Sequence, residues 1–223
     1  MTIEINPKFE KAYFNNGLVK VRLHEYVEAL SDFNKVIEIN PNDEQSYFNR
    51  GHLKYDLQDY YGSLTDYDKA IEINPKFEKA YFNRAHTKKI LKDFEGEIAD
   101  YNKALEINPR YFNAYTNRGI AKSNLKDYKG ALDDFNIAIM LNPNDAEIYC
   151  NRGLTKSILL DYKSAMIDYN KSIELNPNLG EAYLNRGLLK IQLTQKNSGC
   201  IDLNKAKELG NERASKKIKS LCN

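Results

Sequence analysis

The chain has 223 residues, with 33 basic and 31 acidic side chains and a formal net charge of +2. A charge so close to balance argues against bulk nucleic acid as a partner, because polyanions need a basic face. No stretch approaches the ~18 apolar residues of a membrane span, and the N-terminus lacks a signal-peptide pattern. We therefore expect no nucleic-acid partner, no membrane insertion and a cytoplasmic location.

The prolines recur every 34 residues, and each closes an Ile-Asn-Pro or Leu-Asn-Pro tripeptide. The six positions are Pro7, Pro41, Pro75, Pro109, Pro143 and Pro177. A fixed period of this length is typical of a solenoid of stacked repeats. Because proline cannot continue a helix, each one should end the second helix of a pair. A polar turn, as at 58–60, should end the first.

The predicted elements follow in order along the chain. Residues 1–9 read as the remnant of a preceding second helix, because 3–15 and 71–83 have the same sequence. Either the array begins abruptly or the chain is a segment of a longer one. The repeats are then 10–43, 44–77, 78–111, 112–145, 146–179 and 180–211. The last repeat is degraded, since Lys196 replaces the turn tyrosine, and 212–223 reads as an amphipathic capping helix.

Small and large residues recur at fixed places in the repeats. The small column is Gly17, Gly51, Ala85, Gly119, Gly153 and Gly187, and the aromatic column of the second helices is Phe33, Tyr67, Tyr101, Phe135 and Tyr169. Glycine lowers helix stability by ~1 kcal/mol relative to alanine, so its recurrence needs a packing reason. We predict that each aromatic ring packs against the small residue. Glu97 breaks the pattern, because other repeats have Ala, Ser or Gly at its place of close helix contact.

Charged residues recur on the same helices. Each repeat has a lysine three residues after the small column, an arginine just before that column in repeats two to six, and an aspartate on the second helix. The aspartates are Asp32, Asp66, Asp100, Asp134, Asp168 and Asp202. Since a buried charge needs a partner, we predict an internal ionic ladder between these columns. The alternative is a basic stripe for an anionic ligand.

These columns, in this order and at this period, resemble the tetratricopeptide repeat family over residues 10–211. The chain departs from the family pattern in having Tyr for the usual Trp, Arg before the glycine and Lys for the second Tyr. The resemblance implies an all-α fold: a right-handed α-solenoid of six helix-turn-helix repeats plus the C-terminal capping helix. It also implies that the first helices line a concave groove.

Asparagine fills one groove position in every repeat, although it is an average-to-poor helix residue. This asparagine column is Asn15, Asn49, Asn83, Asn117, Asn151 and Asn185. A side-chain amide can both donate to and accept from a peptide backbone, so the column could hold an extended chain. It matches the asparagine ladders of family members such as kinesin light chain and the arm of the Ser/Thr N-acetylglucosamine transferase. The alternative is that each Asn bonds the neighbouring repeat and stiffens the stack.

Other groove residues make the predicted N-terminal half aromatic and basic, and the C-terminal half aliphatic and mildly acidic. The remaining candidate residues for peptide binding are Phe14, Phe48, Phe82, His52, His86, Tyr55, Lys79 and Lys89. They favour a partner segment that is acidic or aromatic, although the Phe side chains could instead pack between repeats. A chaperone-tail clamp is not expected, because Phe14 and Leu18 occupy positions where that clamp needs Lys and Asn.

No catalytic or cofactor motif is found, so we expect no enzyme activity, no cofactor and no metal. His52 and His86 share a column that has no further metal ligand. The three cysteines are too few and too irregular for a disulfide framework, and we expect reduced thiols.

The predicted function is a non-catalytic protein–protein interaction scaffold whose groove binds an extended peptide through the asparagine column. Two alternatives remain. The chain could be a substrate-recognition or assembly arm of a larger enzyme or secretion complex, which a reading frame extending upstream of Met1 would indicate. It could also be a structural array that self-associates weakly through its N-terminal face.

Overall fold

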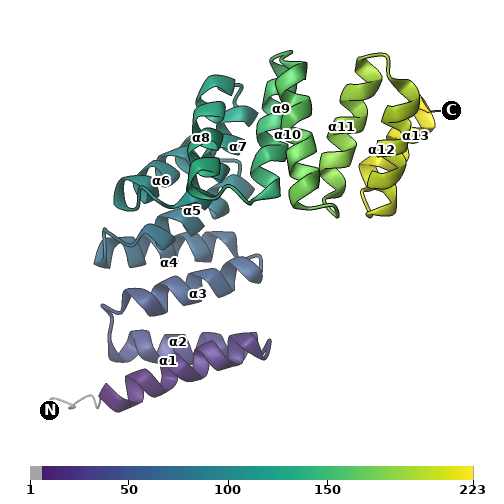
Figure 1. Cartoon of the computed structure of the whole chain (residues 1–223). Helices are drawn as coiled ribbons and strands as arrows, with labels where there is room; N and C mark the ends of the chain where they lie inside the picture. Colours follow the sequence, from purple (N-terminus) through teal and green to yellow (C-terminus); the bar gives the residue numbers. More distant parts are fainter. Residues whose placement is uncertain (1–6, 223) are drawn as a thin grey trace, which may run out of the picture. The chain divides into compact units, whose positions relative to one another are not determined.

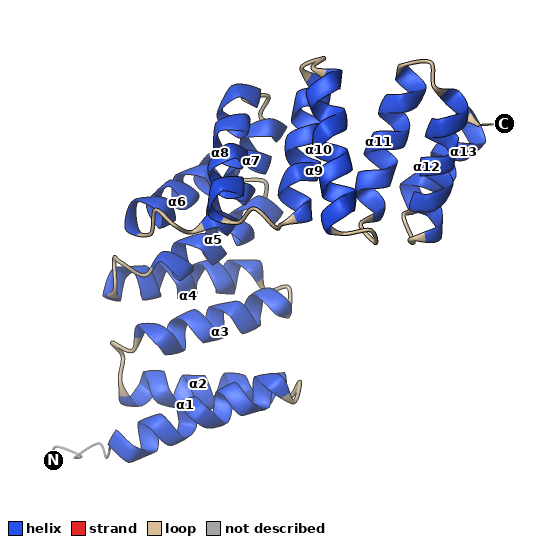
Figure 2. Cartoon of the chain, in the orientation of Figure 1, coloured by secondary structure: helices blue, strands red, loops and turns tan. Residues whose placement is uncertain are grey.

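The structure, a computed structural model, describes residues 7–222, and these form thirteen α-helices and no strand (Figure 2). The helices are α1 (Pro7–Arg22), α2 (Tyr26–Ile39), α3 (Glu44–Asp56), α4 (Tyr60–Ile73), α5 (Glu78–Ile90), α6 (Phe94–Ile107), α7 (Phe112–Asn124), α8 (Tyr128–Leu141), α9 (Ala146–Ile158), α10 (Tyr162–Leu175), α11 (Gly180–Gln192), α12 (Lys196–Glu208) and α13 (Glu212–Leu221). Of the predicted remnant 1–9, residues 1–6 lie outside the described part, and 7–9 open α1.

The chain divides into two compact units, Met1–Pro109 with α1–α6 and Arg110–Asn223 with α7–α13. Within each unit, consecutive helices form antiparallel pairs, and each pair packs on the next (Figure 1). The fold is therefore an all-α repeat solenoid, as the 34-residue period predicts.

Each first helix ends at a left-handed residue that is not glycine. In the second repeat Gln58 has φ +64°. Its N–H donates to the Tyr55 carbonyl over 2.9 Å, and the N–H of Asp59 donates to the Lys54 carbonyl over 2.8 Å. These two bonds are a Schellman motif, which satisfies the last carbonyls of the helix. The equivalent residues are His24, Lys92, Lys126, Leu160 and Thr194.

The second helices end at an Asn-Pro pair, where the hydrogen bonds differ from those that end the first helices. The Asn74 N–H still donates to the Ala70 carbonyl, while the Asn74 side-chain oxygen accepts the N–H of Lys76 over 3.1 Å. This Asx turn spans Pro75, which has no N–H to donate and cannot extend the helix. The same bond recurs at Asn40 and Asn176.

Aspartate begins most second helices. Asp59, Asp93 and Asp127 each accept the backbone N–H of a glycine three residues later over 3.0 Å, and Asp161 accepts that of Ser164 over 3.2 Å. A side chain at this position satisfies one of the N–H groups that the first helical turn leaves free. The sixth repeat lacks the aspartate, because Gln195 precedes α12 and forms no such bond.

The core of each repeat is the predicted contact between a small residue and an aromatic ring. A Cβ added to Gly153 would lie 2.8 Å from the Tyr169 ring, and one added to Gly119 would lie 2.8 Å from the Phe135 ring. Both rings are buried. The glycines are therefore required by close helix approach, and the packing prediction is confirmed.

The cysteines correct one expectation. Cys200 of α12 and Cys222, just after α13, form a disulfide, with their Cα atoms 5.8 Å apart. Sequence spacing could not reveal this pair, because only the return of α13 onto α12 brings the two residues together. The expectation of reduced thiols is wrong for this pair, and Cys150 alone is a free, buried thiol.

Candidate functional site

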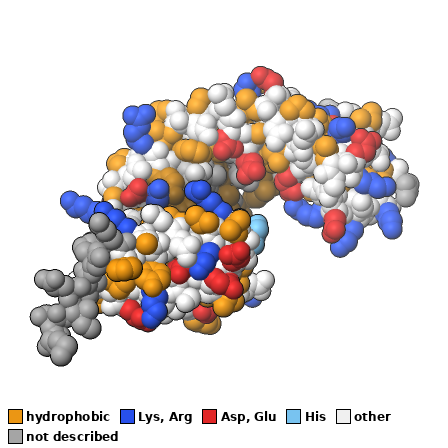
Figure 3. Space-filling model, turned by 90° about the horizontal axis from the view of Figure 1, so that it is seen from below, with side chains coloured by type: hydrophobic (Ala, Val, Ile, Leu, Met, Phe, Trp, Pro, Cys, Tyr) orange, Lys and Arg blue, Asp and Glu red, His pale blue; other side chains and the backbone are white. Residues whose placement is uncertain are grey.

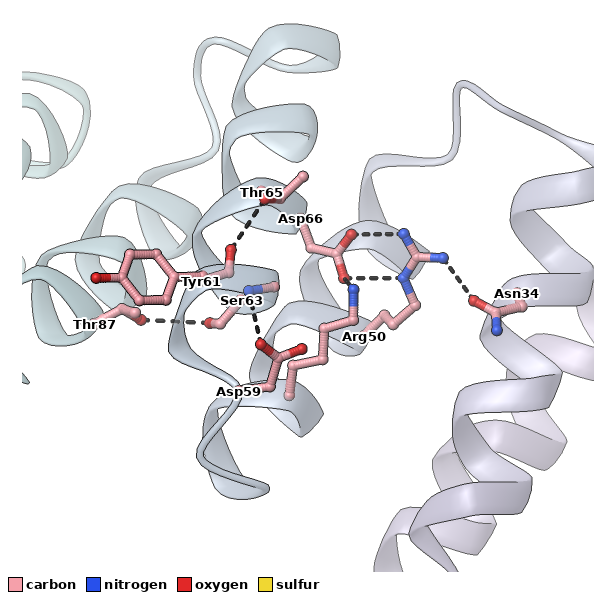
Figure 4. Close-up of polar contacts among 10 residues, drawn as sticks. Asn34, Arg50, Asp59, Tyr61, Ser63, Thr65, Asp66 and Thr87 are labelled. Atoms are coloured by element: carbon pink, nitrogen blue, oxygen red, sulfur yellow. Dashed lines mark hydrogen bonds and ion pairs between the residues drawn. The ribbon is translucent and has the colours of Figure 1, made fainter. Parts of the chain in front are cut away.

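The ionic ladder is present in every repeat, and Figure 4 shows its Arg50–Asp66 pair. In the second repeat, Nε and Nη2 of Arg50 donate to the Asp66 carboxylate over 2.9 and 2.6 Å, and Lys54 Nζ lies 2.9 Å from the same carboxylate. Asp66 is 1% exposed, so its charge is satisfied internally. In the first repeat Asn16 replaces the arginine and donates to Asp32 over 2.7 Å.

The arginines also link neighbouring repeats. Arg50 Nη1 donates to the Asn34 side chain of the preceding repeat over 2.6 Å, as Figure 4 shows. Arg84 Nη1 donates in the same way to Asp68. The Arg50 guanidinium carbon lies 5.4 Å from the centre of the Tyr47 ring, a cation–π distance. These arginines are thus bonded within the protein. This confirms the ionic ladder and argues against a basic stripe that binds an anionic ligand.

Asp202 shows the electrostatic consequence of this arrangement. Burial would raise the pKa of the Asp202 carboxyl, but hydrogen bonds from Arg186 and Lys190 outweigh burial and hold the pKa below its usual range. Folding therefore favours the ionised form of this aspartate.

The asparagine column divides into two kinds of environment. Asn83 lies in one small hollow with Tyr67 of the preceding repeat, and Asn185 donates to Cys150 Sγ over 3.6 Å. Burial raises the pKa of the Cys150 thiol to about 11, which keeps it protonated. Asn185 therefore bridges two repeats, as the stacking alternative predicts, and Asn83 lies at the junction of two repeats.

The other four asparagines form no such bridge in the contacts described. Asn49 and Asn117 donate to carbonyls of their own helices, Gln45 over 2.7 Å and Asn113 over 2.9 Å. Asn15 and Asn151 line separate hollows of about 260 and 200 Å³. The second hollow also contains Glu147 and Glu181, in agreement with the mildly acidic character predicted for this half.

Three predicted groove residues of the first unit lie together. His52, Tyr55 and His86 line a hollow of about 70 Å³ with Asn83 and Tyr67. Burial, with a smaller contribution from the charge of Lys89, lowers the pKa of His86 to about 4. His86 is therefore neutral near pH 7, and its buried Nε2 has no hydrogen-bond partner. Lys79 and Lys89, on which the predicted basic character of this half depends, are not among the residues that line this hollow.

The predicted groove phenylalanines pack against other rings. Phe14 lies 6.0 Å from Phe33, Phe82 lies 5.7 Å from Tyr101, and Phe48 lies 4.8 Å from Phe77, as measured between ring centres. Each of the three is half-buried. The Phe14 and Phe82 contacts lie within single repeats, whereas Phe48 packs against a cluster that includes Ala80 of the next repeat.

Charges of both signs are interspersed on the face shown in Figure 3. Within residues 7–222, no three His, Cys, Asp or Glu side chains come together as a metal site. None of the described helices is both long enough and apolar enough to span a membrane.

Comparisons with known proteins agree with this geometry. Family profiles described as TPR repeat or tetratricopeptide repeat match residues 51–89, 78–111, 112–145 and 146–179. The solved structure of PilF from Pseudomonas aeruginosa superposes with a TM-score of 0.82 at 15% identity, covering 96% of this chain and 98% of that one. Comparison with curated proteins gave no match.

Two further structures show the same fold. YrrB, described as a TPR protein with an unusual peptide-binding site, has a TM-score of 0.68 at 23% identity over 85% of this chain and 98% of its own. A chain of the APC/C hetero-tetramer Cut9–Hcn1 has a TM-score of 0.80 at 15% identity over 98% of this chain and 43% of its own.

The fold and the repeated packing define an α-helical repeat protein of the kind that serves as a protein–protein interaction scaffold. The chain belongs to the tetratricopeptide repeat family.

Proposed function

We propose that this protein is a non-catalytic scaffold whose first helices hold an extended segment of a partner protein. The observation that carries the proposal is the split in the asparagine column. Asn49 and Asn117 bond only carbonyls of their own helices in the contacts described, and Asn15 and Asn151 line hollows, whereas Asn83 and Asn185 lie at junctions between repeats. The first four amides are the candidates for bonds to a partner backbone.

The charge of the first helices suggests the chemistry of the partner. Lys79 is exposed in the first unit, and Glu147 is exposed in the second. Acidic residues in the bound segment would pair with the lysines of the first unit. Because rim charges mainly set association rate and register, we assign the affinity itself to the amides.

The test is selection of displayed peptides against the wild type, followed by measurement of their affinities for a double variant, Asn117→Ala with Asn151→Ala. Each lost hydrogen bond is worth about 1 kcal/mol, so the double variant should bind ~10–30-fold more weakly. Its thermal stability should stay close to that of the wild type, because neither asparagine bridges two repeats in the contacts described.

The matched control is Asn83→Ala with Asn185→Ala. This pair should lower thermal stability, because Asn185 bonds the neighbouring repeat and Asn83 lies beside Tyr67 of the preceding one. Unchanged peptide affinity in the Asn117→Ala, Asn151→Ala variant would show that the column is structural throughout, and the clamp proposal would then fail.

Self-association through the N-terminal face is a second, weaker proposal. Phe9, Val19 and Leu23 are large apolar side chains exposed on and just after α1. Exposed apolar surface of this kind often marks an interface. Sedimentation over a range of concentrations should show a rising mass in the wild type and a constant mass in Phe9→Ser.

The cytoplasmic location predicted from the sequence conflicts with the disulfide. Structural disulfides persist mainly in oxidising compartments, and Cys200–Cys222 is such a crosslink. Thiol labelling, in denaturant, of the protein taken directly from its own cells decides the matter, because Cys150 is buried in the native state. Two protected cysteines would place it in an oxidising compartment, and three reactive ones in the cytoplasm.

A further inference from the structure

A hollow of about 720 Å³ lies on the second unit, on the second helix of the fifth repeat and the turn that follows α11. We call it the outer hollow. Its lining residues are Tyr162, Lys163, Met166, Ile167, Asn170, Lys190, Leu193 and Gln195. None of them belongs to the asparagine column, so the outer hollow is separate from the groove face. Its volume falls within the ~300–1,000 Å³ typical of ligand pockets.

The repeat itself shows that this surface is unusual. The position of Ile167 is occupied in the other repeats by Ser31, Thr65, Ala99, Asp133 and Ile201. It is therefore small or polar in the first four repeats and becomes isoleucine in the last two. Ile167 is 61% exposed and Ile201 is 70% exposed. Ile167 therefore adds exposed apolar surface to the outer hollow, beside the half-buried Met166 and Leu193.

The start of α12 departs from the pattern at the same place. Gln195 stands where four earlier repeats have the capping aspartate, and Lys196 stands where they have Tyr or Phe. Gln195 forms no capping bond, and it lines the outer hollow. Both substitutions forgo local stabilisation, and proteins commonly break local rules at functional sites.

The charged residues that line the outer hollow are Lys163 and Lys190, and no carboxylate is among the lining residues. The exposed Asp161 directly precedes the lining residue Tyr162 in the sequence. Lys190 shares the single carboxylate of Asp202 with Arg186, so this group of three carries a net positive charge. Lys163 and Lys196 are exposed at or beside the rim. An apolar surface next to lysines is complementary to apolar side chains flanked by carboxylates.

We propose that the outer hollow docks a short segment of a partner protein in which apolar residues are flanked by Asp or Glu. The apolar side chains cover Ile167, Met166 and Leu193, and the carboxylates pair with Lys163 and Lys196. This second surface lets the chain hold a partner on the second helices while the groove face is free or occupied.

The probes are two short fluorescent peptides, one with a leucine pair flanked by glutamates and one with lysines in place of the glutamates. Anisotropy titrations should show binding of the glutamate peptide at least about tenfold tighter than of the lysine peptide. Ile167→Thr, which installs the residue of the second repeat, and Lys163→Glu should each weaken binding of the glutamate peptide by about tenfold. Both positions are exposed, so both variants should fold.

The matched control is Lys129→Glu, which changes the equivalent lysine one repeat earlier, beside Asp133 instead of isoleucine. It should leave binding unchanged, as should Asn117→Ala with Asn151→Ala, which separates this proposal from the groove. Equal affinity for the two peptides, equal loss in the Lys129→Glu control, or absence of binding would overturn the proposal. So would concentration-dependent dimerisation that Ile167→Thr abolishes, since the surface would then bind a second copy.

Discussion

At the scale of single residues, the chain buries two kinds of carboxylate. The ladder aspartates are each held by one or two cations, whereas Glu97 is 2% exposed, and burial is the main influence on it. Burial raises the pKa of Glu97 to about 7, against a smaller opposing effect of Lys89. The two kinds should respond to neutralisation in opposite ways, because one charge is compensated and the other costs free energy to bury.

Replacing a ladder aspartate should strongly destabilise the protein. Asp134→Asn leaves Arg118 and Lys122 without the carboxylate that lies 2.6 and 2.8 Å from them. We expect the free energy of unfolding to fall by about 3 kcal/mol, which urea denaturation would measure. The adjacent Asp133 is exposed, and Asp133→Asn should change stability by less than about 0.5 kcal/mol. Equal effects of the two variants would contradict a structural ladder.

Glu97→Gln should stabilise the protein, and only at higher pH. The folded-state pKa of about 7 lies above the ordinary value of 4.5. The wild type therefore loses stability as pH rises from about 4.5 to 7, and the loss is complete above the folded pKa. Glutamine removes this loss, so the variant should exceed the wild type by about 2–3 kcal/mol at pH 8 and match it at pH 4.

The exposed neighbour Glu95 provides the control for Glu97. Urea midpoints of Glu95→Gln measured across the same pH range should follow those of the wild type. A stability difference between Glu97→Gln and the wild type that does not depend on pH would mean that the gain comes from packing and not from charge.

At the scale of elements, the turn inside each repeat is the least favourable part of the backbone. Six residues other than glycine adopt φ between +61° and +66° there. A side chain in this region costs about 1–2 kcal/mol, because Cβ crowds the next carbonyl. Side chains retained there suggest that the Schellman bonds and the following aspartate cap outweigh this cost.

Leu160→Gly should therefore stabilise the fifth repeat. Leu160 has φ +65° and is 68% exposed, so glycine removes strain and loses little packing. We expect the melting temperature to rise, with a gain of about 0.5–1 kcal/mol. Leu159 has φ −79°, so Leu159→Gly should instead lower the melting temperature through added freedom of the unfolded chain. A fall in both variants would show that the side chain of Leu160 is itself needed.

At the scale of the whole molecule, periodic features of the sequence predicted the fold, and isolated ones did not. The spacing of Pro41 and Pro75 predicted the helix pairs, and the matching columns of Arg50, Lys54 and Asp66 predicted the ladder. Each of these patterns repeats, so one geometric solution serves every copy. The hydrogen bond from Arg50 to Asn34 was not predicted. The sequence does contain a periodic pattern that could have indicated it, a polar residue two positions after each ladder aspartate.

The candidate site was less predictable, because asparagines at the same position of different repeats have different neighbours. Asn83 lies beside Tyr67, Asn185 bonds Cys150, and Asn117 bonds only its own helix in the contacts described. Which of these contacts forms depends on side-chain packing between repeats. The asparagine column alone does not indicate that packing. The Cys200–Cys222 pair was missed for a similar reason, since it forms once, where α13 folds back on α12.

Reducing the Cys200–Cys222 disulfide would test whether destabilising one end of the array also destabilises distant repeats. In a solenoid each repeat contacts mainly its neighbours, so a lost crosslink should act locally. The bridge spans 22 residues of sequence, and a loop of this size is worth about 3 kcal/mol. Treating the wild type with a reductant should reduce hydrogen-exchange protection in α12 and α13, where Ala214 packs with Leu203 and Ala206. Protection in α1–α6 should not change.

The variant Cys222→Ser supplies the comparison. It should already show the low protection of the reduced wild type, and the reductant should change it no further. If the reductant instead lowered protection throughout α1–α13, the repeats would unfold as one cooperative unit, and the nearest-neighbour description of this chain would be wrong. If the reductant changed nothing in the wild type, packing of Ala214 and Ile218 against α11 and α12 would hold the cap without the crosslink.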